Sequence, residues 1–296
     1  MSSLRYPDYP LLEKTNIFLL YKAWSSRKDL VNASKVIAKE CSEYVSDDSR
    51  KSRYQRTLHH FKADLLAQLY RETHQRQKYV GLKTFIEFSS GLPRNLLILL
   101  KHIYAWAAFN GELPFSETPI TIRSQQAGVS AASDWFYNDA RMLGRDGQHV
   151  MDGISRLGTL FRSIRFSDKP SECSCSTFSV DVSRCTEEAR RILNLAENWS
   201  LLIDVGSQRD RNTERIDLKY QLNRMLAPRW DLSIYRRGVL ALSPAEINAI
   251  FDPAHNSEFD SLSNARVTRM NAPFEKRRLR KQEPKLGESS DGLFKE

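Results

Sequence analysis

Several enzyme motifs are missing from this sequence. No GxxxxGK[ST] loop is present to hold nucleotide phosphates, and there is no acidic strand of the Walker B kind. The sequence also lacks GxGxxG, HExxH and GxSxG, which excludes the common dinucleotide-binding, zinc-protease and serine-hydrolase sites. We therefore expect the chain to hold no cofactor by itself, and to act as a binding or regulatory module rather than as an enzyme.

Cysteine is scarce, with four residues in 296. Only Cys173 and Cys175 lie near one another, which is not the framework of a disulfide-stabilised secreted domain. Cys185 would be the third member of a metal site. However, a CxC pair without a second pair or a well-spaced histidine lacks the usual spacing of zinc ligands. Reduced thiols and no bound metal are therefore expected.

Long apolar runs are absent as well. Lys101 and His102 interrupt the most apolar part of the sequence, well short of the roughly 20 residues that a membrane-spanning helix needs. The first residues, MSSLRYPDYP, lack the apolar centre of a signal peptide. These absences predict a cytoplasmic protein with no membrane partner. A content of 41% hydrophobic and 27% charged residues predicts a packed globular core.

Positive charge is in excess. The sequence has 45 Lys and Arg against 36 Asp and Glu, which gives a net charge of +9. A positive surface attracts phosphate polymers and other acidic surfaces. An anionic partner is therefore expected, with DNA favoured over RNA, although net charge alone does not locate a site.

Apolar residues recur every three to four positions in the first hundred residues. Leu58, Phe61 and Leu65 show this spacing, which is typical of a helix with one buried face. Pro93 suits a first helical turn, where its missing N–H has no partner to lose. We predict helices over 11–25, 28–45 and 50–76, and a fourth that begins at Pro93.

A loop rich in Gly, Pro and Ser at 111–119 marks a predicted domain boundary. After it, one short helix that ends at Gly128 and another that Ser130 caps would have helix-turn-helix spacing. A third helix is predicted over 147–165, a fourth after the capping residue Thr186, and a last one over 244–251, where Ser243 and Glu246 match a capping box.

Two segments change to a period of two. Apolar and polar residues alternate over 199–205 and 216–222, which predicts two half-buried strands joined by the tip SQRDRNTE. A helix followed by a hairpin is the order found in the second half of a winged helix. The tail loses its apolar period from about residue 275 and is predicted to be disordered.

The segment GLPRNLLILLKHIY resembles the sensor-2 helix in the lid of AAA+ ATPases of the origin-recognition-complex-like class. The runs RLGTLFRSIRFSDKPSE, WSLLI and KYQLNRMLAPRW also resemble the C-terminal part of bacterial ATPases of that class, so that the resemblance covers about residues 55–260. It implies a helical lid followed by winged-helix units, with Arg94 in the position that senses the γ-phosphate. A surface arginine in a first helical turn is the other interpretation of Arg94.

The absence of the P-loop is the main departure from that class. It implies that the ATPase domain lies in another chain, was lost, or is missing because this is a fragment. ATP and Mg²⁺ are expected only if another chain supplies that domain. The resulting prediction is a mainly α protein: a lid-like helical bundle over 1–112, a winged-helix region with a small antiparallel hairpin over 113–260, and a basic tail over 261–296.

The wing-like tip is the predicted contact with nucleic acid, because a basic hairpin can lie against phosphates or enter the minor groove. Asp210 and Glu214 lie between its arginines, so a solvated, salt-bridged loop is the alternative. The basic tail around Arg277 and Arg280 is either a further polyanion patch or a solubilising segment. The candidate contact residues are Arg209, Arg211, Arg215, Arg224, Arg229, Arg236 and Arg237.

Two other functions stay open. The first is an interaction subunit that docks on an AAA+ ATPase or on a defence or replication complex, or that self-associates, with the helix bearing Trp135 and Tyr137 as its contact surface. The second is a magnesium nuclease on the hairpin, in which Asp204 and Asp217 hold the metal while Lys219 orients water.

Overall fold

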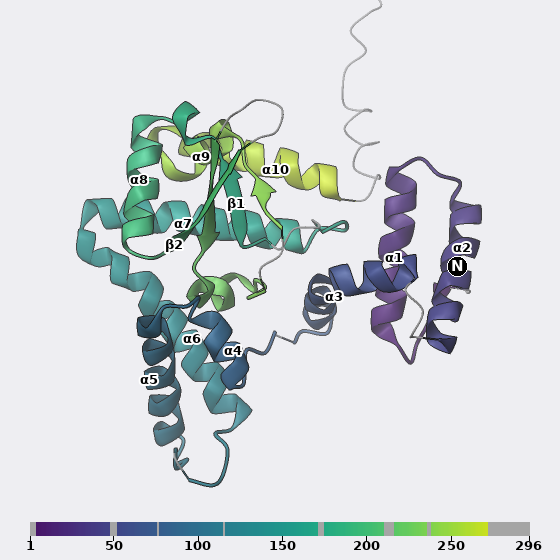
Figure 1. The fold of residues 1–296 in the computed structure, drawn as a ribbon, viewed down its shortest axis with the longest axis horizontal. Coiled ribbons are helices and arrows are strands. Elements are labelled where there is room, and N and C mark those ends of the chain that lie inside the picture. The colour runs from purple at the N-terminus through teal and green to yellow at the C-terminus, as the bar shows by residue number, and fades with distance from the viewer. Residues whose placement is uncertain are drawn as a thin grey trace, which may run out of the picture.

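The computed structural model describes residues 4–47, 52–75, 77–114, 116–170, 175–209, 216–235 and 238–271. These residues are mainly helical with one small four-stranded sheet, which confirms the predicted fold class. Figure 1 shows an N-terminal helical bundle, an arm of long helices, and a body in which helices surround the sheet. No helix in this part of the chain is long and apolar enough to cross a membrane.

The N-terminal bundle forms because three amphipathic helices bury their apolar stripes against one another. Its small core includes the buried Tyr54, whose hydroxyl donates to Asn16 Oδ1 at 2.8 Å. Ser52 caps the third helix by accepting a hydrogen bond from the Gln55 N–H. The three helices predicted from the spacing are therefore confirmed. They are α1 (Pro10–Ser25), α2 (Leu30–Ser46) and α3 (Arg53–Glu72).

The arm consists of α5 (Pro93–Phe109) and α6 (Ile122–Asp139), with the short α4 (Leu82–Phe88) before them. A β-carbon at Gly128 of α6 would lie 2.5 Å from the Cα of Ile103, so this glycine lets the two helices approach closely. The predicted helix-turn-helix break at Gly128 and Ser130 is wrong. The glycine serves helix packing, and α6 continues through it for three further turns.

The body is built on a mixed sheet with strand order β2-β3-β1-β4. Its strands are β1 (Thr177–Val180), β2 (Leu202–Arg209), β3 (Ile216–Leu222) and β4 (Leu240–Ala241). The predicted β2–β3 hairpin is confirmed, and β1 pairs antiparallel with β3 and parallel with β4. Sequence reasoning missed β1 because four residues, TFSV, are too few to show a period against the Ser- and Cys-rich segment before them.

Helices cover the sheet: α7 (Arg145–Arg165), α8 (Glu187–Asn198), α9 (Pro244–Phe251) and α10 (Phe259–Met270), with the 3-10 turns η2 (Ala140–Leu143), η3 (Val182–Arg184), η4 (Arg224–Trp230) and η5 (Pro253–Glu258). The Thr186 cap and the capping box of Ser243 and Glu246 are both present as predicted. The sequence did not predict α4 or α10.

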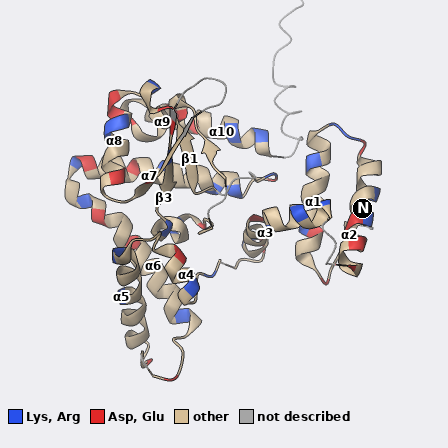
Figure 2. Cartoon of the chain, viewed as in Figure 1, with Lys and Arg blue, Asp and Glu red and all other residues tan. Residues whose placement is uncertain are grey.

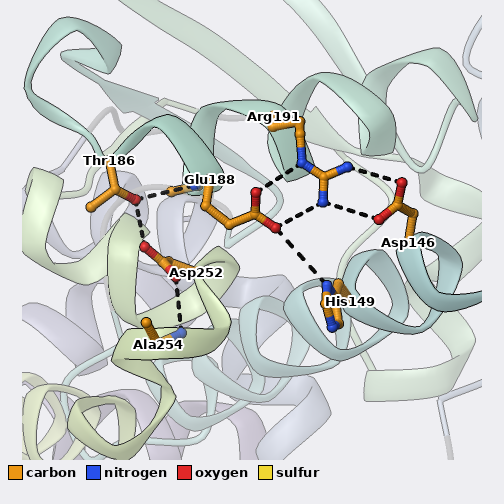
Figure 3. Close-up of polar contacts among 8 residues, drawn as sticks. Asp146, His149, Thr186, Glu188, Arg191, Asp252 and Ala254 are labelled. Atoms are coloured by element: carbon orange, nitrogen blue, oxygen red, sulfur yellow. Dashed lines mark hydrogen bonds and ion pairs between the residues drawn. The ribbon is translucent and has the colours of Figure 1, made fainter.

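Polar contacts join α7, α8 and η5, as Figure 3 shows. The Arg191 guanidinium donates to Asp146 Oδ2 at 2.9 Å and to Glu188 Oε2 at 2.8 Å. The Thr186 hydroxyl donates to Asp252 Oδ2 at 2.7 Å while capping α8. These contacts therefore join α8 to the start of α7 and to the start of η5, and their role is structural.

One core connects the arm to the body. Ile103 of α5, Ile154 of α7 and Phe178 of β1 belong to the same cluster of buried side chains. The helices on either side of residue 113, where the sequence predicts a boundary, pack against each other. The core therefore continues across that position.

Candidate nucleic-acid interface

Three elements converge beside the sheet: the end of α3, the last turns of α7, and η4. The approach of η4 depends on Gly158 of α7, because a β-carbon there would lie 2.3 Å from an atom of the Trp230 ring. The indole packs against the bare backbone and is 7% exposed. Gly158 thereby sets how close η4 comes to α7.

Arg165 fixes α3 in this arrangement and is 2% exposed. Its guanidinium donates to Asp64 Oδ1 at 2.9 Å, to the Ala63 carbonyl at 3.2 Å and to the Asp231 carbonyl. Burial raises the pKa of the Asp64 carboxyl, and the charge of Arg165 opposes that rise. One buried cation thus ties α3 and η4 to the end of α7.

Beside this anchor lies a cleft of about 490 Å³. The charged residues that line it are Arg71, Arg162, Arg229 and Asp231, and Phe166 and Trp230 form part of its wall. The lining therefore carries three guanidinium groups against one carboxylate, together with His74. Such a surface is electropositive and attracts anions.

Aromatic rings support the three guanidinium groups. Those of Arg71 and Arg162 lie 5.0 Å and 5.5 Å from the centre of the Phe166 ring. That of Arg229 lies 4.1 Å from the centre of the Tyr137 ring. Cation–π contacts of this kind orient a guanidinium without using its N–H donors, which leaves donors available for phosphate oxygens.

Two of the arginines also have carboxylate partners. Arg162 Nη2 lies 3.2 Å from Asp231 Oδ2, and Arg229 Nη1 lies 2.7 Å from Asp134 Oδ1. The Asp134 side chain is 61% exposed. An ion pair so open to water contributes little free energy, and a phosphate can replace the carboxylate. Within the described part of the chain, no carboxylate oxygen lies within 4.0 Å of the Arg71 guanidinium.

Among the predicted nucleic-acid contacts, the structure describes the side chains of Arg224 and Arg229, and Arg229 lines this cleft. Arg224 instead donates to Glu87 Oε2 at 2.7 Å and is 14% exposed, so it joins η4 to α4. The backbone of Arg209 ends β2. Arg211, Arg215, Arg236, Arg237 and the basic tail lie outside the described residues, and their predicted role stays a prediction.

Arg94 lies in the first turn of α5, and its side chain is 69% exposed. Its Nη2 atom lies 3.2 Å from Asp139 Oδ2 at the end of α6. This contact neither requires nor excludes a phosphate ligand, so the nucleotide-sensing role also stays a prediction.

No sequence motif identifies Arg71 or Arg162 as a site residue. Both lie on helices where charged residues are ordinary, and they meet only because α3 packs across the end of α7. Arg162 does fall within the run RLGTLFRSIRFSDKPSE, on which the resemblance rests in part. The run KYQLNRMLAPRW, on which the resemblance also rests, contains Arg229 and so pointed to the same region.

The hairpin does not assemble the nuclease constellation. Cross-strand pairing places Asp204 opposite Tyr220, and Asp217 opposite Gln208. Because side chains alternate along a strand, Asp204 lies on the Tyr220 face, while Asp217 and Lys219 lie on the other. The predicted convergence of the three residues is therefore wrong. The described residues contain no group of three or more His, Cys, Asp or Glu placed to hold a metal.

Cys175 and Cys185 are both buried. Burial raises the pKa of the Cys185 thiol to about 11, which disfavours the thiolate that a metal ligand requires. Cys173, the remaining member of the considered metal site, lies outside the described residues.

The predicted contact helix buries most of its aromatic residues. Phe136 and Tyr137 are buried, and the Tyr137 hydroxyl donates to the Met151 carbonyl at 2.8 Å. Trp135 is 40% exposed and lies beside His102 of α5. Two of the three aromatic residues therefore pack in the hydrophobic core.

Comparison with known proteins gives one result. A family model described as ORC-CDC6-like matches residues 2–242, which include the bundle, the arm, α7, α8 and all four strands. No curated protein and no solved structure matches the chain.

Proposed function

The chain belongs to the ORC-CDC6-like family, and from this premise we propose that it is a non-catalytic nucleic-acid-binding module of an initiator-like assembly. The arginine cleft, defined by Arg71, Arg162 and Arg229, would bind the phosphate backbone. DNA is the proposed ligand, and any ATPase activity would come from a partner chain.

The convergence of the three arginines carries this proposal. They come from α3, α7 and η4, and they line one cleft that contains a single carboxylate. Guanidinium groups bind phosphate oxygens through paired N–H donors. Aromatic rings orient the three guanidinium groups, and the ion pairs of two of them are open to water. Binding a phosphate therefore costs little free energy in lost contacts.

The strand arrangement supports a winged-helix unit as part of the proposal. In the sheet, β3 lies between β1 and β2, and α8 precedes the β2–β3 hairpin. In that interpretation the tip with Arg211 and Arg215 is the wing, and it would add phosphate contacts to those of the cleft.

Fluorescence anisotropy of labelled duplex and single-stranded DNA across a salt series tests the proposal. The variant Arg71→Ala/Arg229→Ala removes two charges from the cleft. Losing two duplex-phosphate contacts lowers the slope of log K against log salt by about 2. Binding weakens equally for unrelated sequences, because phosphate contacts carry no sequence information.

The matched control is Lys39→Ala/Lys83→Ala, which removes the same charge from exposed positions outside the cleft. If both double variants lower the slope equally, binding follows net charge and the cleft proposal is wrong. If the wild type does not bind DNA even at low salt, the proposed binding of DNA is wrong. A third variant, Arg211→Ala/Arg215→Ala, measures the contribution of the wing separately.

A further inference from the structure

The arginine cleft is continuous with two further pockets around η4. Pro228 lines the cleft and both pockets, which have volumes of about 270 Å³ and 450 Å³. The smaller pocket shares Gln77 and Asp231 with the cleft, and the larger one shares Arg229 and Trp230 with it. A ligand bound at the arginines therefore has two adjoining pockets within reach.

The larger pocket has a different lining from the cleft, and we call it the serine pocket. Three hydroxyl side chains line it, from Ser130, Ser133 and Ser155, together with the ion pair of Asp134 and Arg229. The charges of that pair cancel, so hydroxyl groups supply the remaining polar lining. A hydroxyl group both donates and accepts hydrogen bonds, whereas a guanidinium only donates them. The serine pocket therefore suits a neutral polar group better than a second phosphate.

Ser133 is 2% exposed, and its hydroxyl oxygen has no hydrogen-bond partner among the described residues. Elsewhere in this chain a helical hydroxyl donates to the carbonyl one turn earlier, as Thr15 does to Leu11 at 2.7 Å. Gln77, between the cleft and the smaller pocket, also has a buried side-chain oxygen without a partner. Such groups are rare because each costs free energy. A ligand in the serine pocket would supply the partner that Ser133 lacks, after a rotation of its side chain about one bond.

An unstacked nucleobase matches this arrangement. Its edge carries neutral donors and acceptors, and the 450 Å³ of the serine pocket lies within the roughly 300–1,000 Å³ of small-ligand pockets. Arg229 borders both the cleft and the pocket, so a nucleotide whose phosphate contacts Arg229 has its base close to the pocket. In a duplex the base edges lie in grooves that only a protruding element reaches. A pocket receives a base only after that base has left the stack.

Charge alone does not choose between single-stranded and double-stranded DNA. Lys and Arg are spread over the bundle, the arm and the body, as Figure 2 shows, and both forms of DNA present phosphates. Proteins that bind single strands combine a basic groove for the backbone with contacts to exposed bases. The neutral serine pocket beside the arginines is therefore the feature that favours a single strand.

We infer that this groove binds single-stranded DNA, with phosphates at the arginine cleft and one unstacked base in the serine pocket. The inference rests on the proposed function, because it assumes that the arginines hold phosphates. Hydroxyl groups serve as donors or as acceptors, so little preference among the four bases is expected.

Fluorescence anisotropy at one salt concentration tests the inference with three probes of equal length. They are a single strand, the corresponding duplex, and a strand in which abasic sites replace the bases while the phosphates are unchanged. The wild type should bind the single strand at least about tenfold more tightly than either other probe, because only this probe offers both phosphates and free bases.

Two variants test the pocket itself. A leucine at Ser130, an exposed residue that lines the pocket, fills part of it, so Ser130→Leu should remove the difference between the single strand and the abasic strand. Ser133→Ala should lower the single-strand affinity by about 3- to 10-fold, the size of one hydrogen bond. It should not lower the urea midpoint, because that hydroxyl has no partner in the free protein. The matched control is Ser42→Leu, at an exposed serine of α2, which should keep the wild-type difference between the probes.

A duplex that binds as tightly as the single strand overturns the inference, and so does a wild type that binds the abasic strand as tightly as the normal one. If Arg71→Ala/Arg229→Ala still weakens binding in those cases, the proposed function stands and only the base pocket fails. Equal losses for Ser42→Leu and Ser130→Leu also overturn the inference. No binding to any of the three probes contradicts the proposed function itself.

Discussion

Replacing Arg165 by Met tests whether one buried cation holds the arginine cleft together. Methionine fills similar space but removes every donor. The change leaves Asp64 without its ion-pair partner. It also removes the N–H groups that donate hydrogen bonds to the carbonyls of Ala63 and Asp231. Breaking a buried ion pair by deleting one partner costs about 3–5 kcal/mol. We expect a loss of about 4 kcal/mol in the free energy of unfolding.

Urea unfolding followed by circular dichroism measures that loss. Two further variants keep the test informative if Arg165→Met folds poorly. Arg165→Lys retains the charge with fewer donors, so it should lose less. Asp64→Asn/Arg165→Met removes the unpaired carboxylate, so it should recover part of the loss relative to Arg165→Met alone. A loss below about 1 kcal/mol for Arg165→Met, the typical effect of an ordinary substitution, refutes the reasoning.

Two further predictions concern stability. Gly158→Ala places a β-carbon 2.3 Å from the Trp230 ring, and overpacking of this kind costs about 1–3 kcal/mol. That cost exceeds the roughly 1 kcal/mol that alanine gains in a helix, so urea unfolding should show a net loss, and a net gain would contradict the packing. Arg191 lowers the pKa of both Asp146 and Glu188 through hydrogen bonds. A carboxyl whose pKa is lower in the folded than in the unfolded protein stabilises the fold only while it is ionised. The difference in the free energy of unfolding between the wild type and Arg191→Gln should therefore shrink as the pH falls below about 4. A difference that is constant from neutral pH to about pH 3 would argue against this contact.

The features predicted well from the sequence are those that short-range rules govern. The caps at Thr186 and at Ser243 depend on a few neighbouring residues, and so does the hairpin with its alternating strands. The break expected at Gly128 failed for a physical reason. A glycine permits either a turn or a close helix contact, and only the position of Ile103, 25 residues earlier, decides between them.

The candidate site was harder to predict because it is not local. Arg229 was recognised as a basic residue near the hairpin, but its partners in the cleft come from α3 and α7. Nothing in the spacing of Arg71 and Arg162 indicates that they meet. The nuclease hypothesis depended on the register between β2 and β3, which the sequence does not specify. The pairing of Asp204 with Tyr220 and the bulge between Asp204 and Ser207 are properties of the folded sheet.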